Sequence, residues 1–217
     1  IQDEVSVWLN GTLVVDSVPL ENYWERGRPL PEEGPIWLQA HDSKLYFKNI
    51  FIRELSGEER LYSGPLFNGE DLTGWEQVGG EEGSWGVENG LLFTEGAGGG
   101  WLSTDRTFDN FKLSLEFRVP EGGNSGVFLR TPREGNPAYV GMEAQVLDDY
   151  AEKYETLQPW QYTGSIYAVV APSKRVTKPA GEWNTYEILC NGPNVKIWLN
   201  GELVNDTNLI HHMDKAD

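Results

Sequence analysis

Three short runs between residues 113 and 149 alternate apolar with polar side chains, and this pattern restricts the region to β-strands. The runs are Leu113-Ser-Leu-Glu-Phe-Arg-Val119, Gly126-Val-Phe-Leu-Arg130 and Gly141-Met-Glu-Ala-Gln-Val-Leu-Asp-Asp149. Successive side chains of a strand point to opposite faces of its sheet. The pattern therefore predicts three neighbouring strands of one sheet, with an apolar core face and a second face of Glu, Arg and Gln side chains.

The polar face has two interpretations, an ordinary solvated surface or a ligand site. Its charges are mixed in sign, and the first two runs are joined by Gly122-Gly-Asn-Ser-Gly126, where the backbone can approach a ligand closely. These two observations favour the ligand site. We therefore expect four side chains to gather in one hollow on this face: Glu116, Arg130, Glu143 and Gln145.

The rest of the chain indicates an all-β sandwich with few or no helices. With 25 glycines and 12 prolines among 217 residues, short strand-like runs alternate with turns at the spacing of a sandwich. One exception is 148–162, which predicts a short helix or a long loop. The net charge of −17 argues against nucleic acid or an anionic membrane as partner. No apolar run is long enough to span a bilayer, the sequence shows no signal-peptide pattern, and Cys190 alone forms no intramolecular disulfide.

A hairpin sequence occurs twice, nearly a whole chain apart. Val5-Ser-Val-Trp-Leu-Asn-Gly-Thr-Leu-Val-Val-Asp16 returns as Val195-Lys-Ile-Trp-Leu-Asn-Gly-Glu-Leu-Val-Asn-Asp206. An Asn-Gly pair between two strand-like runs predicts a hairpin in each copy. Residues from about 5 to 55 therefore look like the end of one domain, and residues from 66 onward look like the start of one. The two runs 35–41 and 45–53 predict an antiparallel pair.

Several motifs together resemble the 3-keto-disaccharide hydrolase family, whose domains have a concanavalin A-like two-sheet antiparallel sandwich (jelly roll). The motifs of the main body are Leu66–Trp75, Asn124–Arg130, Gly141–Asp148, Thr163–Tyr167, Pro179–Asn184 and Trp198–Gly201. The segments that resemble the family's C-terminal tail are Leu20–Arg28, Gly34–Gln39 and Phe47–Arg53. The tail thus comes first, so we expect residues 1–63 to be a tail segment that completes the sandwich and 64–217 to be its main body.

Three arrangements satisfy this rotated order. The tail segment can fold back onto its own chain, as in a circular permutant, which is the arrangement we favour. It can complete a neighbouring molecule by head-to-tail strand donation, or the chain can be part of a tandem array cut in mid-domain. A sheet without its closing strands would expose unpaired edges, so one of the first two is expected. The resemblance also implies a periplasmic or extracellular location.

The resemblance implies a substrate whose 3-keto group acidifies the proton on C2, so that a base can start elimination of the C1 leaving group and water can then add. Such chemistry needs a base and a donor for the enolate oxygen. We expect Glu143 or His41 as the base and Arg130 as the enolate stabiliser. The expected substrate-binding residues are Asn124, Gln145, Glu116, Tyr167, Trp24 and Arg28.

Each of these assignments has a structural alternative. His41 can cap a strand end, Glu143 and Arg130 can form a buried ion pair, and the aromatic residues can fill a core. No cofactor is expected; Asp148 is a weak candidate for calcium, although a turn or helix cap suits it better. Glu143 is not followed by a second carboxylate in the spacing of retaining glucanases. Two other functions therefore stay open, a non-catalytic carbohydrate-binding module and a structural protein that self-associates head to tail.

Overall fold

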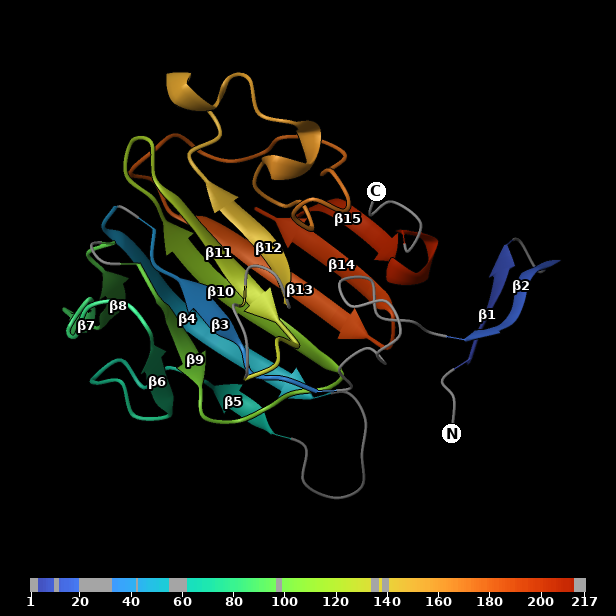
Figure 1. The fold of residues 1–217 in the computed structure, drawn as a ribbon, viewed down its shortest axis with the longest axis horizontal. Coiled ribbons are helices and arrows are strands. Elements are labelled where there is room, and N and C mark those ends of the chain that lie inside the picture. Colours follow the sequence, from blue (N-terminus) through green and yellow to red (C-terminus); the bar gives the residue numbers. More distant parts are fainter. Residues whose placement is uncertain are drawn as a thin grey trace.

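The protein is a sandwich of two antiparallel β-sheets, which confirms the predicted fold class. The computed structural model describes residues 4–9, 12–19, 33–41, 43–54, 62–96, 99–133, 137 and 141–212, with the backbone alone for 4–19, 54 and 211–212. Figure 1 shows the two layers and the order of the strands. The helices among the described residues are short 3₁₀ turns, and none of them is long and apolar enough to cross a membrane.

The larger sheet has the strand order β15-β14-β13-β10-β4-β8-β7, with β5 also paired to β4. The smaller sheet has five strands in the order β12-β11-β3-β9-β6. The strands of the larger sheet are β4 (Leu45–Glu54), β5 (Ser63–Pro65), β7 (Trp85–Glu88), β8 (Leu91–Thr94), β10 (Phe111–Arg118), β13 (Asn184–Asn191), β14 (Asn194–Leu199) and β15 (Glu202–Asn208). Those of the smaller sheet are β3 (Trp37–Gln39), β6 (Trp75–Val78), β9 (Trp101–Thr104), β11 (Asn124–Leu129) and β12 (Met142–Leu147).

Two strands from the N-terminal segment lie in the middle of the two sheets of the same chain. β4 pairs with β10 on one side and β8 on the other, and β3 pairs with β11 and β9. Without them, each sheet would be divided into two halves. β3 and β4 thus lie in the interior of the two sheets, with a paired strand on each side.

Two expectations about strand pairing were wrong. β10 belongs to the larger sheet, while β11 and β12 belong to the smaller one, so the three alternating runs do not share a sheet. The connection at residues 119–123 therefore crosses from one layer to the other and does not form a hairpin. Likewise β3 and β4 follow each other in the chain but lie in different sheets. Alternation shows which side chains share a face, but not which strand lies next to which.

The core lies between the sheets and takes one face from each. On β10 the inward side chains are Phe111, Leu113, Leu115 and Phe117, all fully buried. On the smaller sheet the inward positions include Leu38, Val127, Ala144 and Val146. The polar positions of β10 are therefore on the outside of the larger sheet.

A tyrosine of the larger sheet reaches across the core to the smaller one. Tyr186 of β13 is fully buried, and its ring lies 4.9 Å from that of Phe117. Its hydroxyl donates to the carbonyl of Gln145 in β12 at 2.5 Å and accepts from the N–H of Gly164 at 2.7 Å. Burial is the main cause of a raised Tyr186 pKa, so the phenol stays a donor. This bond fixes β12 relative to the opposite layer.

The segment 148–162 is a long loop with two 3₁₀ turns, η1 (Glu152–Tyr154) and η2 (Pro159–Gln161). Asp149 anchors it, because its buried carboxylate accepts from the N–H and hydroxyl of Thr163 and from the hydroxyl of Thr177. A third 3₁₀ turn, η3 (Leu209–His212), follows β15. The remaining two strands, β1 (Glu4–Leu9) and β2 (Thr12–Pro19), form a two-stranded sheet of their own, which Figure 1 shows beside the sandwich.

Candidate functional site

The outward face of the smaller sheet, which we call the outer face, carries polar and aromatic side chains. Along each strand, the residues of the outer face alternate with the inward residues named above, and the strand registers place them opposite one another. On β12 and β11 they are Glu143, Gln145, Asn124, Gly126 and Phe128, and on β3 and β9 they are Trp37, Gln39, Trp101 and Ser103. Phe128 and Trp37 are buried yet lie outside the hydrophobic core between the sheets. The outer face is therefore a second protected layer.

The strand registers place these side chains in rows. Glu143 lies opposite Phe128, Phe128 lies opposite Trp37, and Trp37 lies opposite Ser103. Since neighbouring strands are about 4.8 Å apart, Glu143 and Trp37 are about 10 Å apart along this row. The Trp37 and Trp101 rings meet edge to face, with their centroids 6.4 Å apart. The carboxyl group of Glu143 and the indoles of Trp37 and Trp101 thus lie on one face of the sheet.

The Glu143 side chain bends over Gly126 of the neighbouring strand. A Cβ built on Gly126 would be 1.9 Å from Oε1 of Glu143 and 2.7 Å from its Cδ. Contacts of this length are impossible, so any other residue at position 126 would force the carboxyl group to move. Gly126 therefore has a steric role, since its missing side chain is the space in which the Glu143 carboxyl group lies.

The environment of Glu143 favours its neutral form at ordinary pH. Burial raises the pKa of its carboxyl group from the ordinary 4.5 to about 8. The side chain has no hydrogen bond or ion pair with any other residue that the structure describes, so no charge offsets the desolvation. The residue as a whole keeps some contact with solvent. A carboxyl group with these properties is a typical candidate for proton transfer near neutral pH.

Several buried polar atoms on the outer face have no hydrogen-bond partner. Among the described residues, six buried side-chain polar atoms lack one, and three of them belong to this face: Nε1 of Trp37, Nε1 of Trp101 and Oδ1 of Asn124. Buried polar groups in proteins are nearly always paired, and clustered exceptions call for an explanation. Two N–H donors and one acceptor on the same face as the Glu143 carboxyl group are of the kind that pairs with the hydroxyl and carbonyl groups of a carbohydrate.

Four of the predicted residues are brought together. Glu143, Gln145 and Asn124 share the outer face, and Tyr167 lies beside β12, where its N–H donates to the Glu143 carbonyl at 3.0 Å. The Tyr167 hydroxyl accepts from Gln161 at 2.9 Å. Gln145 is buried, and its Oε1 accepts from the N–H of Val146. The backbone of the segment after η2 thus supports β12 at the position of Glu143.

Glu116 is not part of this group, and the expected hollow with four polar side chains does not exist. Glu116 belongs to β10 and points outward from the larger sheet, the layer opposite Glu143. There it accepts from Asn49 at 2.5 Å and pairs with Lys48 at 3.2 Å. Its neighbours on that surface are cations over aromatic rings, such as Lys48 over Trp183. This surface is the solvated face that was the alternative interpretation.

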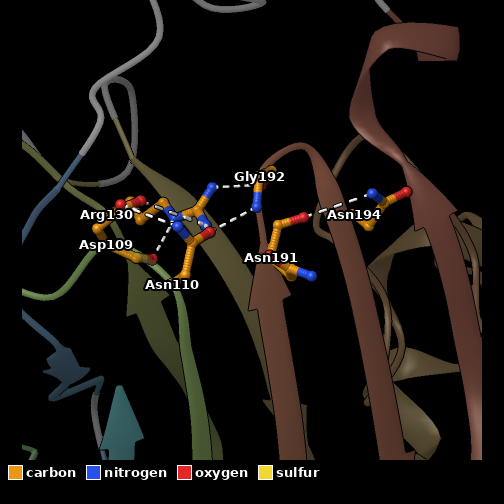
Figure 2. A network of polar contacts seen from close by, with 6 residues as sticks. All are labelled: Asp109, Asn110, Arg130, Asn191, Gly192 and Asn194. Carbon is orange, nitrogen blue, oxygen red and sulfur yellow. Dashed lines mark hydrogen bonds and ion pairs between the residues drawn. The ribbon is translucent and has the colours of Figure 1, made fainter. Parts of the chain in front are cut away.

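Arg130 joins the ends of the two sheets, so the expectation that it stabilises a reacting oxygen was wrong. Its Nε donates to the Asp109 carbonyl at 2.9 Å, Nη1 donates to the Gly192 carbonyl at 2.6 Å, and Nη2 donates to Oδ1 of Asn110 at 3.2 Å. Figure 2 shows these contacts. Each of the three guanidinium nitrogens donates one of these hydrogen bonds, so the group is held between the loops at the ends of the two sheets.

The remaining candidates lie elsewhere. His41 follows the end of β3 and is exposed; the antiparallel pairing of β3 with β11 puts it at the same end of the sheet as Asn124. Asp148 accepts from the N–H groups of Gly122 and Tyr150, as in a turn cap. Among the described residues, no group of three or more His, Cys, Asp or Glu side chains could hold a metal ion. Trp24 and Arg28 lie outside the described residues.

Sequence reasoning missed Trp37 and Trp101. Trp37 stands between the core residues Ile36 and Leu38, and Trp101 directly precedes the core residue Leu102. The available signal was the alternation itself, because Ile36 and Leu38 fill the core and Trp37 must therefore point the other way. When successive residues of a strand are all apolar and buried on both faces, the sequence does not show which aromatic side chain points away from the core.

Comparisons with known proteins agree with a carbohydrate-active domain. The family model of the 3-keto-alpha-glucoside-1,2-lyase-like domain matches residues 1–53 and 63–216. A 3-keto-disaccharide hydrolase of Bacteroides thetaiotaomicron is 30% identical over a match of 147 residues. The match covers 57% of this chain and 51% of that protein. The chain thus spans about half the length of this curated relative.

Solved structures give the same result. A "putative glycosyl hydrolase" of Parabacteroides distasonis is 27% identical with a TM-score of 0.57, over 67% of this chain and 72% of that chain. A second structure with the same description, also from Parabacteroides distasonis, is 29% identical with a TM-score of 0.56, over 72% of this chain and 78% of that chain. The likeness covers most of the sandwich.

The raised pKa of Glu143 predicts a pH-dependent cost in stability. Between the ordinary pKa of 4.5 and the folded value of about 8, the folded state holds a proton that the unfolded state has lost. The free energy of unfolding therefore falls as the pH rises through this range and is constant above it. Glu143→Gln removes the penalty and should raise the free energy of unfolding at pH 8 by about 1–3 kcal/mol, with little effect at pH 5. Urea unfolding at both pH values measures this, and equal effects at the two would contradict it.

Proposed function

The chain belongs to the family of 3-keto-alpha-glucoside-1,2-lyase-like domains, and we propose that it cleaves the glycosidic bond of 3-keto-glycosides with Glu143 as the general base. The observation that carries the proposal is the buried Glu143 carboxyl group, whose pKa is raised to about 8 on a face with unpaired donors. The family supports a sugar substrate. A periplasmic or extracellular location stays an expectation from the family alone.

The proposed reaction begins at C2 of the keto sugar. The Glu143 carboxylate takes the C2 proton, and the electron pair of that bond moves toward the C3 carbonyl to give an enolate. The enolate then forms a C1–C2 double bond while the C1–O bond breaks, and the leaving alcohol takes a proton. Water next adds to C1 and a proton returns to C2, so that the net change is hydrolysis. A base with a pKa near the working pH suits the first step best.

A single carboxyl group favours this route over double displacement. Retaining glycosidases need two carboxyl groups about 5 Å apart. Among the described residues on the outer face, Glu76 of β6 is the other carboxylate, and it lies opposite Ser103, four strands away from Glu143. That separation is about 19 Å across the sheet, far too great for such a pair.

The other groups on this face can hold the sugar. Nε1–H of Trp37, in the same row as Glu143, is a donor for the oxygen that becomes the enolate, whereas Nε1–H of Trp101 and Oδ1 of Asn124 lie farther along the face, where they can pair with other groups of the sugar. Hydrogen bonds to a reacting oxygen in a buried site stabilise developing charge more than they do in water. We assign the enolate-stabilising role to the Trp37 N–H in place of Arg130, because the guanidinium group of Arg130 is already engaged.

Loss of the carboxylate should abolish turnover without loss of the fold. Glu143→Gln should lower kcat/KM for a 3-keto-disaccharide by at least about 1,000-fold, measured as release of reducing sugar, because the base is gone. Glu116→Gln is the matched control, since this carboxylate lies on the opposite sheet, and its rate should stay within about twofold. A wild-type protein that binds the sugar without any turnover would instead indicate a carbohydrate-binding module.

The pH profile tests the environment of the base. Glu143 acts in its ionised form, and its pKa of about 8 means that the protonated, inactive form dominates below that pH. The value of kcat/KM should therefore rise about tenfold per pH unit up to pH 7 and level off above pH 8 or 9. A glutamate with the ordinary pKa would give a level profile from pH 6 upward, and that result would exclude Glu143 in this environment as the base.

Gly126 should act as a positioning residue for Glu143. Gly126→Ala places a Cβ where Oε1 now lies, so the carboxyl group must move by an ångström or more. A displacement of this size should lower kcat by about 100-fold while KM changes less. Gly64→Ala in β5 is the control, because its added Cβ meets only the side chain of Tyr62, whose hydroxyl is the nearest atom at 3.3 Å. Unchanged kcat in Gly126→Ala would show that this geometry is not used.

A further inference from the structure

The β1–β2 hairpin has the geometry of the β14–β15 hairpin whose sequence it repeats. Trp8 pairs with Leu13 and Leu9 with Thr12, and at the matching places Trp198 pairs with Leu203 and Leu199 with Glu202. The shift in register between Val7 and Trp8 recurs between Ile197 and Trp198, whereas a second shift between Val5 and Val7 has no counterpart in β14–β15. A β-bulge at the same place of both copies is a specific feature, because bulges re-aim the strand that follows them. From Val7 to Val15, the half next to the turn, β1–β2 therefore repeats the pairing of β14–β15.

The β14–β15 hairpin is stable because it buries apolar side chains against the sandwich. Val195, Ile197, Leu199 and Val204 are at most 1% exposed and belong to the core. The counterparts in the N-terminal copy are the apolar residues Val5, Val7, Leu9 and Val14. The N-terminal copy has thus kept the residue types that its twin uses for burial.

The two hairpins differ in their neighbours. β14 pairs with β15 on one side and with β13 on the other, whereas the sheet that holds β1 contains only β1 and β2 among the described strands. An isolated two-stranded hairpin is marginally stable at best in water. In its own chain the β13 edge is already occupied by β14. A duplicate hairpin with apolar residues therefore fits an edge on another domain.

We propose that β1–β2 binds a second sandwich domain of this fold, in the position that β14–β15 hold here, with β1 paired to that domain's counterpart of β13. The partner is a domain whose β13 edge is open. Strand addition at a sheet edge supplies backbone hydrogen bonds, and alternate side chains supply specificity. The register is set by the bulge and by the apolar pattern, both of which match this edge. The chain then serves two domains, since β3 and β4 complete this sandwich while β1–β2 closes the other. This inference does not depend on the proposed activity.

A substitution that weakens the packing of β14 should open the β13 edge of this sandwich, so that it can bind β1–β2. In the full-length chain, Ile197→Asp places a charge at a fully buried position of β14, and β1–β2 of the same or another molecule should then take its place. We expect Ile197→Asp to keep a cooperative urea transition and Val7→Asp alone to change the wild-type midpoint little. The double variant should lose the transition, with a coupling of at least tenfold in the folded-to-unfolded ratio. Ser6→Asp, at the position that matches the half-exposed Lys196, is the control and should not couple.

Hydrogen exchange gives a direct measurement on a milder variant, in case Ile197→Asp does not fold. In wild type the amides of residues 5–9 should exchange fast, because β1 has only β2 as a neighbour. In Ile197→Ala they should exchange at least tenfold more slowly as β1 replaces β14, and Val7→Asp should reverse this. Independent effects of the substitutions at positions 7 and 197, together with unchanged exchange in β1, would overturn the proposal.

Discussion

The structure depends on the backbone pairing of two strands that come early in the chain and lie in the middle of both sheets. β4 runs between β10 and β8, and β3 runs between β11 and β9. Each of these strands forms backbone hydrogen bonds with a neighbour on both sides. Their inward apolar side chains belong to the core between the two sheets. Leu45, Phe47 and Leu38 are fully buried. The site depends on this pairing as well, because β3 carries Trp37 into the outer face beside β11.

On the outer face, the features that hold the Glu143 carboxyl group in place also lower the stability of the fold. Glu143 lies opposite the buried Phe128, and burial of its carboxyl group opposes its ionisation. Gly126 has no side chain to pack, and the Glu143 carboxyl group lies in the space that a side chain would fill. Each feature costs folding free energy and serves positioning, which is the combination expected where a binding or reacting group is held.

Much of the fold followed from local pattern, whereas the site did so only in part. The strands around residues 113–119, 126–130 and 141–147 were predicted because alternation is a local property. Their assignment to sheets was not, because Gly122–Gly126 has the composition of a hairpin turn although the chain crosses between layers there. Glu116 was consequently placed on the wrong surface. Glu143, Gln145 and Asn124 do share one face, as expected, because β11 and β12 are neighbouring strands. The roles of Arg130 and Trp37 depend on contacts with distant segments, which no local pattern encodes.

The link that Tyr186 makes between the layers has a consequence for the response of the sandwich to alkali. Burial raises the pKa of the Tyr186 hydroxyl well above its ordinary value, so the hydroxyl keeps its proton well into alkaline solution. This link therefore does not titrate where Glu143 does. A mildly basic medium can thus change the charge of the Glu143 carboxyl group while the hydrogen bond that fixes β12 to the opposite layer stays intact.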